Sequence, residues 1–336
     1  MKTTIFATLF TLSVAAPAFA ATPARIDTPK SGMIKVAFVI SDGANVMDIA
    51  GSWEVFQDTM VRDAHGNDIM PFELFTVAPG KALLHTTGSN RPGLAITPDY
   101  SFADAPTPDL VVVGAQSGGD GLTEWLQKIH AQGKTIMSVC TGAFKLAKAG
   151  LLDGKPATTH HWYFGSMEQQ YPKVKLVREV RYVQSDPITF TAGGLTSGVD
   201  LSLHIVADYF GEVVAQKAAD YMEYQGTGWK SNTGISQLTT PVTRADWTGT
   251  LGADSKIVLH QVTEGVSNTF TADIASQKLS GIPVTASGDS NKTRIVFEIS
   301  DHPATFEGTA NADGTQVSGA FVQDGKSTPL TLVKSG

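Results

Sequence analysis

The sequence predicts two folded parts: an α/β domain with a doubly wound, mostly parallel sheet over residues 34–229, and a small all-β domain over residues 246–336. Three observations predict this. Short apolar runs alternate with helical patterns in the first part, which is typical of a parallel sheet covered by helices. Residues 230–245 are rich in Ser, Thr and Gly and predict a linker. Beyond them helical periodicity disappears, and short alternating segments between turn clusters indicate a barrel or a sandwich.

The N-terminal residues have the pattern of a secretory signal peptide. Lys2 gives a basic start, and the apolar run from Ile5 to Ala16 is too short to span a bilayer comfortably. The sequence Ala18-Phe19-Ala20 predicts cleavage after Ala20, and an uncleaved anchor is the alternative. Residues 21–33 read as a linker. We therefore expect a periplasmic or secreted protein that does not contact the membrane after cleavage.

The charge balance bears on the partners. The chain has a formal net charge of -7, and Lys2 is the only charged residue of residues 1–20, so cleavage would bring the charge to about -8. An acidic chain without a basic run lacks the electrostatic surface that nucleic acids require. We expect a small-molecule substrate and no nucleic-acid partner.

The predicted elements of the α/β domain follow in order, with strands as continuous apolar runs and helices as periodic patterns. The predicted strands are Ile34–Ile40, Phe72–Val77, Leu110–Val113, Thr135–Val139, Pro156–Thr159, Val174–Val177, Arg181–Val183 and Ile188–Ala192. The predicted helices are one with Ser52 as its N-cap, then Leu122–Ala131, Ala143–Ala149, His160–Tyr171, Leu201–Tyr209 and Val213–Met222. Sites in such sheets lie at the carboxyl ends of the strands. We expect three loops to lie at this edge of the sheet: the loop that carries Asp48, the loop that carries Gly118 and Gly119, and the turn at Cys140.

Cys140 is the only cysteine, and it lies between an apolar strand and a helix. A lone thiol in an oxidising compartment is either buried and inert or retained for its reactivity. At the start of a helix, the dipole and free amides stabilise a thiolate and can hold an oxyanion. The amide of Thr141 is the first predicted donor. A structural buried cysteine is the alternative.

Two further loops supply candidate partners. The Gly114–Gly121 loop lacks the G-x-G-x-x-G order and a Walker-type lysine, so it predicts no dinucleotide or phosphate site. The amide of Gly118 or Gly119 could face Cys140, or the loop is an ordinary turn. Asp48 is expected beside the thiol, where repulsion and desolvation favour its neutral form and let it donate a proton. A plain carboxylate at a helix start is the alternative.

His160 and His161 are adjacent, so on a helix they would lie about 100° apart. No H-x-x-x-H or C-x-x-C pattern exists, and we predict neither a metal site nor a cofactor. One of the two histidines could border the site; otherwise both are surface or packed residues.

Residues 34 to about 225 resemble the ThiJ/PfpI group of the class I glutamine-amidotransferase-like superfamily, nearest to isonitrile hydratases and to the amidase-like sensor domains of AraC-type regulators. The motifs that carry this resemblance are Asp48-Ile49-Ala50-Gly51 with Glu54-Val55-Phe56, Val111-Val112-Val113-Gly114, Ser138-Val139-Cys140-Thr141-Gly142-Ala143 with Leu151-Leu152-Asp153-Gly154, Ala157-Thr158-Thr159-His160-His161-Trp162, and Thr191-Ala192-Gly193-Gly194 with Gly198-Val199-Asp200.

The resemblance implies a flavodoxin-like sheet, a nucleophile elbow at Cys140 and an acid partner at Asp48. His160, His161 and Gly51 are candidates to line the site. Thr141 stands where the peptidase branch has a histidine, which argues against a Cys-His protease. The Gly114–Gly119 loop lacks the proline of the family's usual Pro-Gly-Gly run. Family members are commonly dimers, so a homodimer is implied.

The second domain resembles the small lipocalin-like β modules of exported bacterial hydrolases, through Trp247-Thr248-Gly249-Thr250-Leu251 and the hairpin of Phe306-Glu307-Gly308-Thr309 with Val317-Ser318-Gly319. Its β pattern is not a helix-turn-helix, which excludes a transcription factor; its own partner is not predicted.

We predict an exported Cys-dependent enzyme, isonitrile hydratase-like or amidase-like, that adds water to or hydrolyses a small C–N substrate. Two alternatives stay open: a non-catalytic periplasmic module that binds or senses a small molecule, and a redox or stress protein that acts through oxidation of Cys140.

Overall fold

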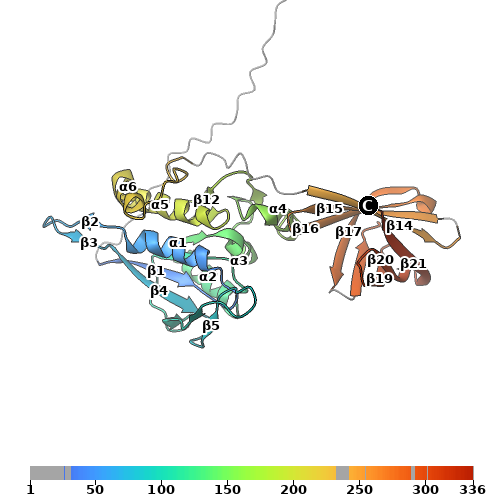
Figure 1. The fold of residues 1–336 in the computed structure, drawn as a ribbon, viewed down its shortest axis with the longest axis horizontal. Helices are drawn as coiled ribbons and strands as arrows, with labels where there is room; N and C mark the ends of the chain where they lie inside the picture. Colours follow the sequence, from blue (N-terminus) through green and yellow to red (C-terminus); the bar gives the residue numbers. More distant parts are fainter. Residues whose placement is uncertain are drawn as a thin grey trace, which may run out of the picture.

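The computed structural model consists of an α/β lobe and a β-barrel lobe, which lie side by side (Figure 1). It describes residues 26, 32–231, 242–253, 255–288, 292–300 and 302–335. The predicted signal peptide, its cleavage point after Ala20 and most of both predicted linkers lie outside these residues. Among the helices that the structure describes, none has the length and apolar character needed to cross a membrane.

The α/β lobe is built on a seven-stranded sheet with the order β12-β13-β9-β8-β1-β4-β7. Its strands are β1 Ile34–Val39, β4 Phe72–Ala78, β7 Tyr100–Ser101, β8 Leu110–Val113, β9 Thr135–Ser138, β12 Tyr182–Asp186 and β13 Thr189–Ala192. Every neighbouring pair is parallel except β12 with β13. Strands β8 and β9 are buried along their whole length, which explains their continuous apolar sequence.

Helices cover both faces of this sheet. They are α1 Val46–Gln57, α2 Leu122–Ala131, α3 Ala143–Lys148, α4 Phe164–Gln170, α5 Thr196–Phe210 and α6 Glu212–Tyr221. One apolar core lies under α1 and α5, with Phe38 and Phe56 among its buried residues, and a second lies under α2 and α3, with Leu126 and Leu146. The predicted flavodoxin-like α/β fold is therefore confirmed.

Shorter elements complete the lobe. They are β2 Val61–Arg62 paired with β3 Asp68–Ile69, β5 Leu84–His85 paired with β6 Ala95–Ile96, β10 Pro156–Ala157 paired with β11 Lys175–Leu176, and the 3-10 turns η1 Cys140–Gly142 and η2 His161–Tyr163.

Two helices begin earlier than the sequence predicted, and α4 begins later, at Phe164 rather than His160, because residues 161–163 form the 3-10 turn η2. Helix α1 starts at Val46, because Asn45 caps it by accepting hydrogen bonds from the amides of Met47 and Asp48, and Ser52 is buried inside the helix. Helix α5 starts at Thr196 rather than Leu201, directly after a turn at Leu195. The earlier starts matter for function, since they bring Asp48 and Leu195 to the first turns of two helices.

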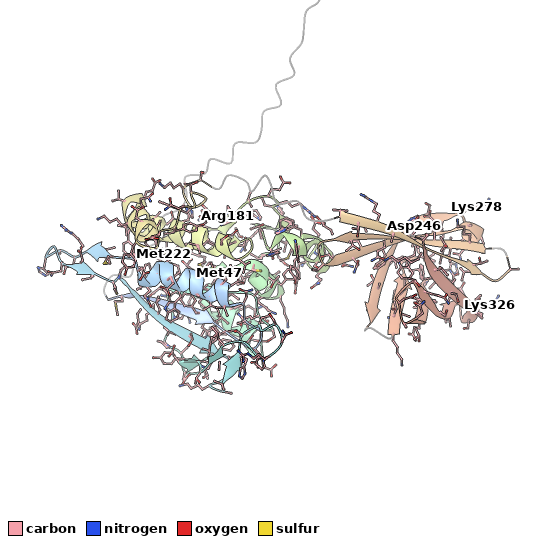
Figure 2. All side chains as sticks on the ribbon, in the orientation of Figure 1. Met47, Arg181, Met222, Asp246, Lys278 and Lys326 are labelled. Carbon is pink, nitrogen blue, oxygen red and sulfur yellow. The ribbon has the colours of Figure 1, made fainter. Side chains whose placement is uncertain are left out.

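The second lobe is a closed barrel of antiparallel neighbours. Its strands are β14 Val242–Leu251, β15 Ser255–Glu264, β16 Ser267–Ile274, β17 Leu279–Gly288, β18 Lys292–Phe297, β19 Ala304–Ala310, β20 Gln316–Gln323 and β21 Lys326–Ser335, with the 3-10 turn η3 Ala275–Gln277. Of the predicted barrel and sandwich, the barrel is the one formed. Asp246, Lys278 and Lys326 mark this lobe in Figure 2.

Side chains fill the middle of the barrel. Ile257, Phe297, Phe306 and Leu332 belong to one buried apolar cluster contributed by strands on all sides. Such a packed interior is typical of small barrels, in which alternate residues of each strand point inward. The outer surface of the barrel, rather than its lumen, is therefore the part that meets its surroundings.

Candidate active site

Cys140 occupies a sharp elbow between β9 and α3. Its φ of 58° is positive, a conformation that costs energy for a residue with a Cβ atom. Two hydrogen bonds to the Cys140 backbone hold it there: the Cys140 amide donates to the Gly193 carbonyl at 2.8 Å, and the Thr159 hydroxyl donates to the Cys140 carbonyl at 2.9 Å. The elbow is thus fixed from two other segments of the lobe.

Gly142 lets this elbow pack against the carboxyl end of β8. A Cβ atom at Gly142 would lie 1.9 Å from the Val113 carbonyl oxygen, so no other residue fits without moving backbone. The same Val113 carbonyl accepts a hydrogen bond from the Val139 amide at 2.9 Å. Cys140 therefore lies at the carboxyl edge of the sheet, the edge at which doubly wound folds place their sites.

Asp48 lies on the first turn of α1 and is completely buried. Its Oδ2 accepts a hydrogen bond from the Ala115 amide at 2.8 Å. Its Oδ1 accepts no hydrogen bond of ordinary geometry from the described residues. Burial raises the pKa of Asp48 to about 6, although the Ala115 amide, the Cys140 thiol and the Leu195 amide each pull that pKa down by stabilising the charged form.

Cys140 is 7% exposed as a residue, and its thiol is held in the neutral form. Burial, followed by the negative charge of Asp48, raises the pKa of Cys140 to about 12. The amides of Thr141 and Leu195 and the Thr141 hydroxyl act in the opposite direction, but their effect is smaller. Above pH 6 the site therefore rests as a carboxylate beside a neutral thiol.

Leu195 is the site residue that the sequence did not reveal. It has φ 49° and ψ -98°, a rare conformation for a residue with a side chain, at the turn before α5. In this conformation its amide stabilises both the Cys140 sulfur and the Asp48 carboxylate. The only local signal is the preceding Gly193-Gly194 pair, which does not specify the turn.

Three predicted site residues lie elsewhere in the packing. The Gly118 amide donates to the Ser41 hydroxyl at 2.8 Å, and a Cβ atom on Gly119 would lie 2.4 Å from Pro79 Cγ. The groups that shift the thiol's pKa do not include this loop. Gly51 lies between helices, where a Cβ atom would be 3.0 Å from Val199 Cγ2. These glycines thus shape the loop and the contact between α1 and α5.

His160 and His161 stack on each other, with ring centroids 4.6 Å apart and planes inclined by 21°. Burial lowers the pKa of both rings, so they are neutral near pH 7. His160 Nδ1 accepts a hydrogen bond from the Trp162 amide at 3.2 Å, so in the neutral ring Nε2 carries the proton. Within the described residues, no group of His, Cys, Asp and Glu side chains could hold a metal ion.

A cavity of about 200 Å³ opens beside the elbow. Its lining residues are Thr159, His160, His161, Phe164, Glu179, Val180, Arg181 and the turn Gly193–Ser197. Thr159 and Gly193 are the residues that bond the Cys140 backbone, so the cavity borders the elbow although the thiol is not part of its lining. Arg181, which Figure 2 shows on the same lobe as Met47 of α1, is anchored by Asp200 at 2.5 Å.

A comparison of the sequence with known families agrees with the α/β fold. The pattern of the DJ-1/PfpI family matches residues 34–208, which is more than half of the chain. The chain belongs to the DJ-1/PfpI family.

Its relatives include an enzyme and a regulator. The isonitrile hydratase of Pseudomonas putida is 28% identical over 57% of this chain and 78% of its own length. The HTH-type transcriptional regulator GbdR of Pseudomonas aeruginosa is 31% identical over 40% of this chain, which spans only 37% of that regulator. Among solved structures, a ThiJ/PfpI family protein from Pseudomonas syringae is 26% identical, with 64% of this chain and 84% of that chain covered and a TM-score of 0.48.

Proposed function

We propose that this protein is a Cys-dependent enzyme of the isonitrile hydratase type, which adds water to a small isonitrile. The observation that carries the proposal is the buried pair of Asp48 and Cys140, a carboxylate beside a neutral thiol at a strained elbow. A pair in this state holds a nucleophile, a base and one transferable proton in a single place.

The first half of the reaction uses all three. The Cys140 sulfur attacks the terminal carbon of the isonitrile and forms a C–S bond, while Asp48 accepts the thiol proton. Asp48 then donates that proton to the same carbon, which gives a thioimidate with a C=N double bond. The neutral thiol is an advantage here, because the substrate carbon needs both the sulfur and a proton.

The second half adds water. A water molecule attacks the thioimidate carbon with Asp48 as base, and the nitrogen gains a proton. The C–S bond then breaks, the sulfur regains a proton, and an N-substituted formamide leaves. The net change is one isonitrile plus one water to one formamide. The amides of Thr141 and Leu195 would stabilise the negative charge that develops during this step.

The same two amides favour amide hydrolysis as the second candidate, since they could hold the oxyanion of a tetrahedral intermediate. A panel of isonitriles, amides and glyoxals, incubated with the wild type and with Cys140→Ala, separates the two. We expect formamides from isonitriles, lost in Cys140→Ala. Hydrolysis of amides without isonitrile turnover would assign the protein to the amidases. Small-molecule binding without turnover, or selective oxidation of Cys140, would instead support the non-catalytic or the redox alternative.

We further propose that the enzyme works as a homodimer in the periplasm or outside the cell, on a small molecule and without nucleic acid. The sequence pattern of residues 1–20 supports export. Fractionation of a bacterial host and N-terminal sequencing of the mature protein test this, with Ala21 expected as the first residue. A protein that keeps its full N-terminus in the cytoplasm would refute the export proposal, and a monomer in sedimentation would refute the dimer.

A further inference from the structure

The barrel touches the α/β lobe at the tip of its β15–β16 hairpin. The Val266 amide donates to the Trp162 carbonyl at 3.2 Å. Gly265, at the same tip, has φ 60°, and a Cβ atom there would lie 2.5 Å from the Trp162 carbonyl oxygen. The hairpin tip therefore lies directly on the backbone of η2, the turn that follows His160.

A pair of serines makes a second contact. The Ser267 hydroxyl accepts a hydrogen bond from the Ser166 amide at 2.9 Å, and the two serine hydroxyls are 2.5 Å apart. Next to them, a Cβ atom on Gly165 would lie 3.1 Å from Ser267 Cβ, so the absence of a side chain at Gly165 permits the approach. This contact joins β16 to α4, which lie together at the junction of the lobes in Figure 1.

Arg178 makes the third contact. Its guanidinium bonds Glu264 of the hairpin at 2.5 Å and Glu168 of α4 at 2.8 Å. The same guanidinium lies over the ring of Phe164, 5.0 Å from the ring centroid. Phe164 lines the cavity beside Cys140. Glu264 of the barrel is therefore linked to the cavity wall through Arg178.

The segment held in this way has little stability of its own. Helix α4 is seven residues long and η2 is three, and helices this short depend on packing rather than on their own hydrogen bonds. Met167 anchors one side of α4 in the core of the α/β lobe. The barrel hairpin holds the other side.

We propose that the barrel is an architectural part of the substrate cavity: its hairpin Glu264–Ser267 positions segment 160–168, which contributes His160, His161 and Phe164 to the cavity wall. This inference rests on the proposed function only in treating that cavity as the place that receives the substrate. Glu264 and Ser267 are positioning residues, because they act through Arg178 and α4 and do not touch the cavity. The filled lumen of the barrel is consistent with this role, because the barrel then contacts the α/β lobe only through its outer surface.

A cross-link tests the contact without any assumption about activity. In the Ser166→Cys, Ser267→Cys double variant, mild oxidation should form a disulfide, because hydroxyls 2.5 Å apart place the Cβ atoms near disulfide range. The matched control is Ser255→Cys with Ser276→Cys, a pair inside the barrel lobe whose hydroxyls are 2.6 Å apart. A disulfide in the control without one between the lobes would overturn the proposal.

A second arm tests the positioning. In Glu264→Gln combined with Ser267→Ala, we expect KM for an isonitrile to rise about fivefold while kcat changes little, because the wall loosens but the elbow stays intact. Glu307→Gln breaks the Arg294–Glu307 pair on the barrel surface and should change neither value. The disulfide-locked variant should keep the wild-type KM. Equal KM in all variants would overturn the proposal and leave the proposed function standing.

Alkylation of Cys140 supplies a readout that needs no turnover. We expect the variant with Glu264→Gln and Ser267→Ala to show a higher ratio of the rate for the bulkier N-phenylmaleimide to the rate for iodoacetamide than the wild type. Glu307→Gln should leave this ratio unchanged. If no isonitrile or amide is turned over, the proposed function fails while this ratio still reports on the wall. An unchanged ratio in the double variant would refute the positioning role.

Discussion

Asp48 and Cys140 shift each other's pKa in opposite directions: the charge of the carboxylate raises the pKa of the thiol, whereas the thiol lowers the pKa of the carboxyl by stabilising its charged form. Burial of both groups makes this coupling strong, because little water screens it. The result is an ionised carboxyl beside a thiol that keeps its proton near neutral pH. In the proposed reaction, the thiol proton moves to Asp48 when the sulfur attacks the substrate.

The first prediction concerns Asp48→Asn. Removal of the negative charge should lower the pKa of Cys140, so iodoacetamide should label it faster at each pH from 7 to 10, by up to about tenfold. Turnover should fall by about 10² to 10⁴, because the base is lost. Asp153→Asn, which breaks a surface pair with Lys173, should change neither rate. Labelling and turnover that fall together would contradict the coupling.

The pH dependence of kcat/KM supplies a second prediction. The active free enzyme has Asp48 ionised and Cys140 protonated, so kcat/KM should rise as the pH passes through about 6 and then stay level up to at least pH 9. The residual activity of Asp48→Asn should lack the rise near pH 6. A wild-type profile that instead climbs steadily from pH 7 to 9 would mean that thiolate formation, rather than Asp48, limits the rate.

Burial of Asp48 also predicts a pH-dependent stability. The folded-state pKa is raised from 3.8 to about 6, so the folded protein binds the proton more tightly than the unfolded chain. The stabilising contribution is complete below pH 3.8 and is lost as the pH rises through about 6, a difference of about 3 kcal/mol. Asp48→Asn stays neutral and does not lose this contribution. Its free energy of unfolding should therefore increase relative to that of the wild type as the pH rises across this window.

Urea unfolding of both proteins at pH 4 and pH 7.5 measures this difference. We expect the free energy of unfolding of Asp48→Asn minus that of the wild type to be more positive at pH 7.5 than at pH 4. The same difference for Asp153→Asn should not change with pH. A difference for Asp48→Asn that is the same at both pH values would show that Asp48 does not titrate within the window.

The parts of this site that the sequence predicted are those with a local signal. Cys140 stands between a buried strand and a helix, and Asp48 follows another strand whose end must share the same edge of the sheet. Thr141 follows from its place after Cys140. In each case a pattern of a few residues, joined with the topology of parallel sheets, is sufficient.

The remaining parts depend on contacts between distant segments. The amide of Leu195 points at the site only because α5 closes over a strained turn, and the amide of Gly118 is bonded by Ser41, which lies on a different strand end. The start of α1 depends on whether Asn45 or Ser52 caps it, and both residue types are good caps. The contact of the hairpin with α4 joins two lobes, and no local pattern encodes it.

Gly142→Ala tests the packing of the elbow. The new Cβ atom would meet the Val113 carbonyl oxygen, a backbone atom of a central strand that cannot move away cheaply. We expect a loss of about 3 kcal/mol or more in the free energy of unfolding. The control is Gly80→Ala, where a Cβ atom meets nothing within 4 Å, and its stability should change by less than about 1 kcal/mol. Equal effects in urea unfolding would show that the elbow can relax.

The last prediction concerns the strain that Cys140 stores at its positive φ. Cys140→Ala and Cys140→Gly both remove the thiol, but only glycine adopts a φ of 58° without the steric cost of a Cβ atom. Relief of that strain exceeds the extra flexibility that glycine gives to the unfolded chain, so Cys140→Gly should be more stable than Cys140→Ala by about 1 kcal/mol.

A helical position should show the opposite order. Ala131 lies at the end of α2, and Ala131→Gly should cost up to about 1 kcal/mol because glycine only adds flexibility there. Urea unfolding of the three variants and the wild type supplies the comparison. If Cys140→Gly is no more stable than Cys140→Ala, the elbow carries no strain. If it is more stable, the fold gives up stability at this residue to hold the sulfur beside Asp48, which indicates that the geometry of the pair is maintained for chemistry rather than for packing.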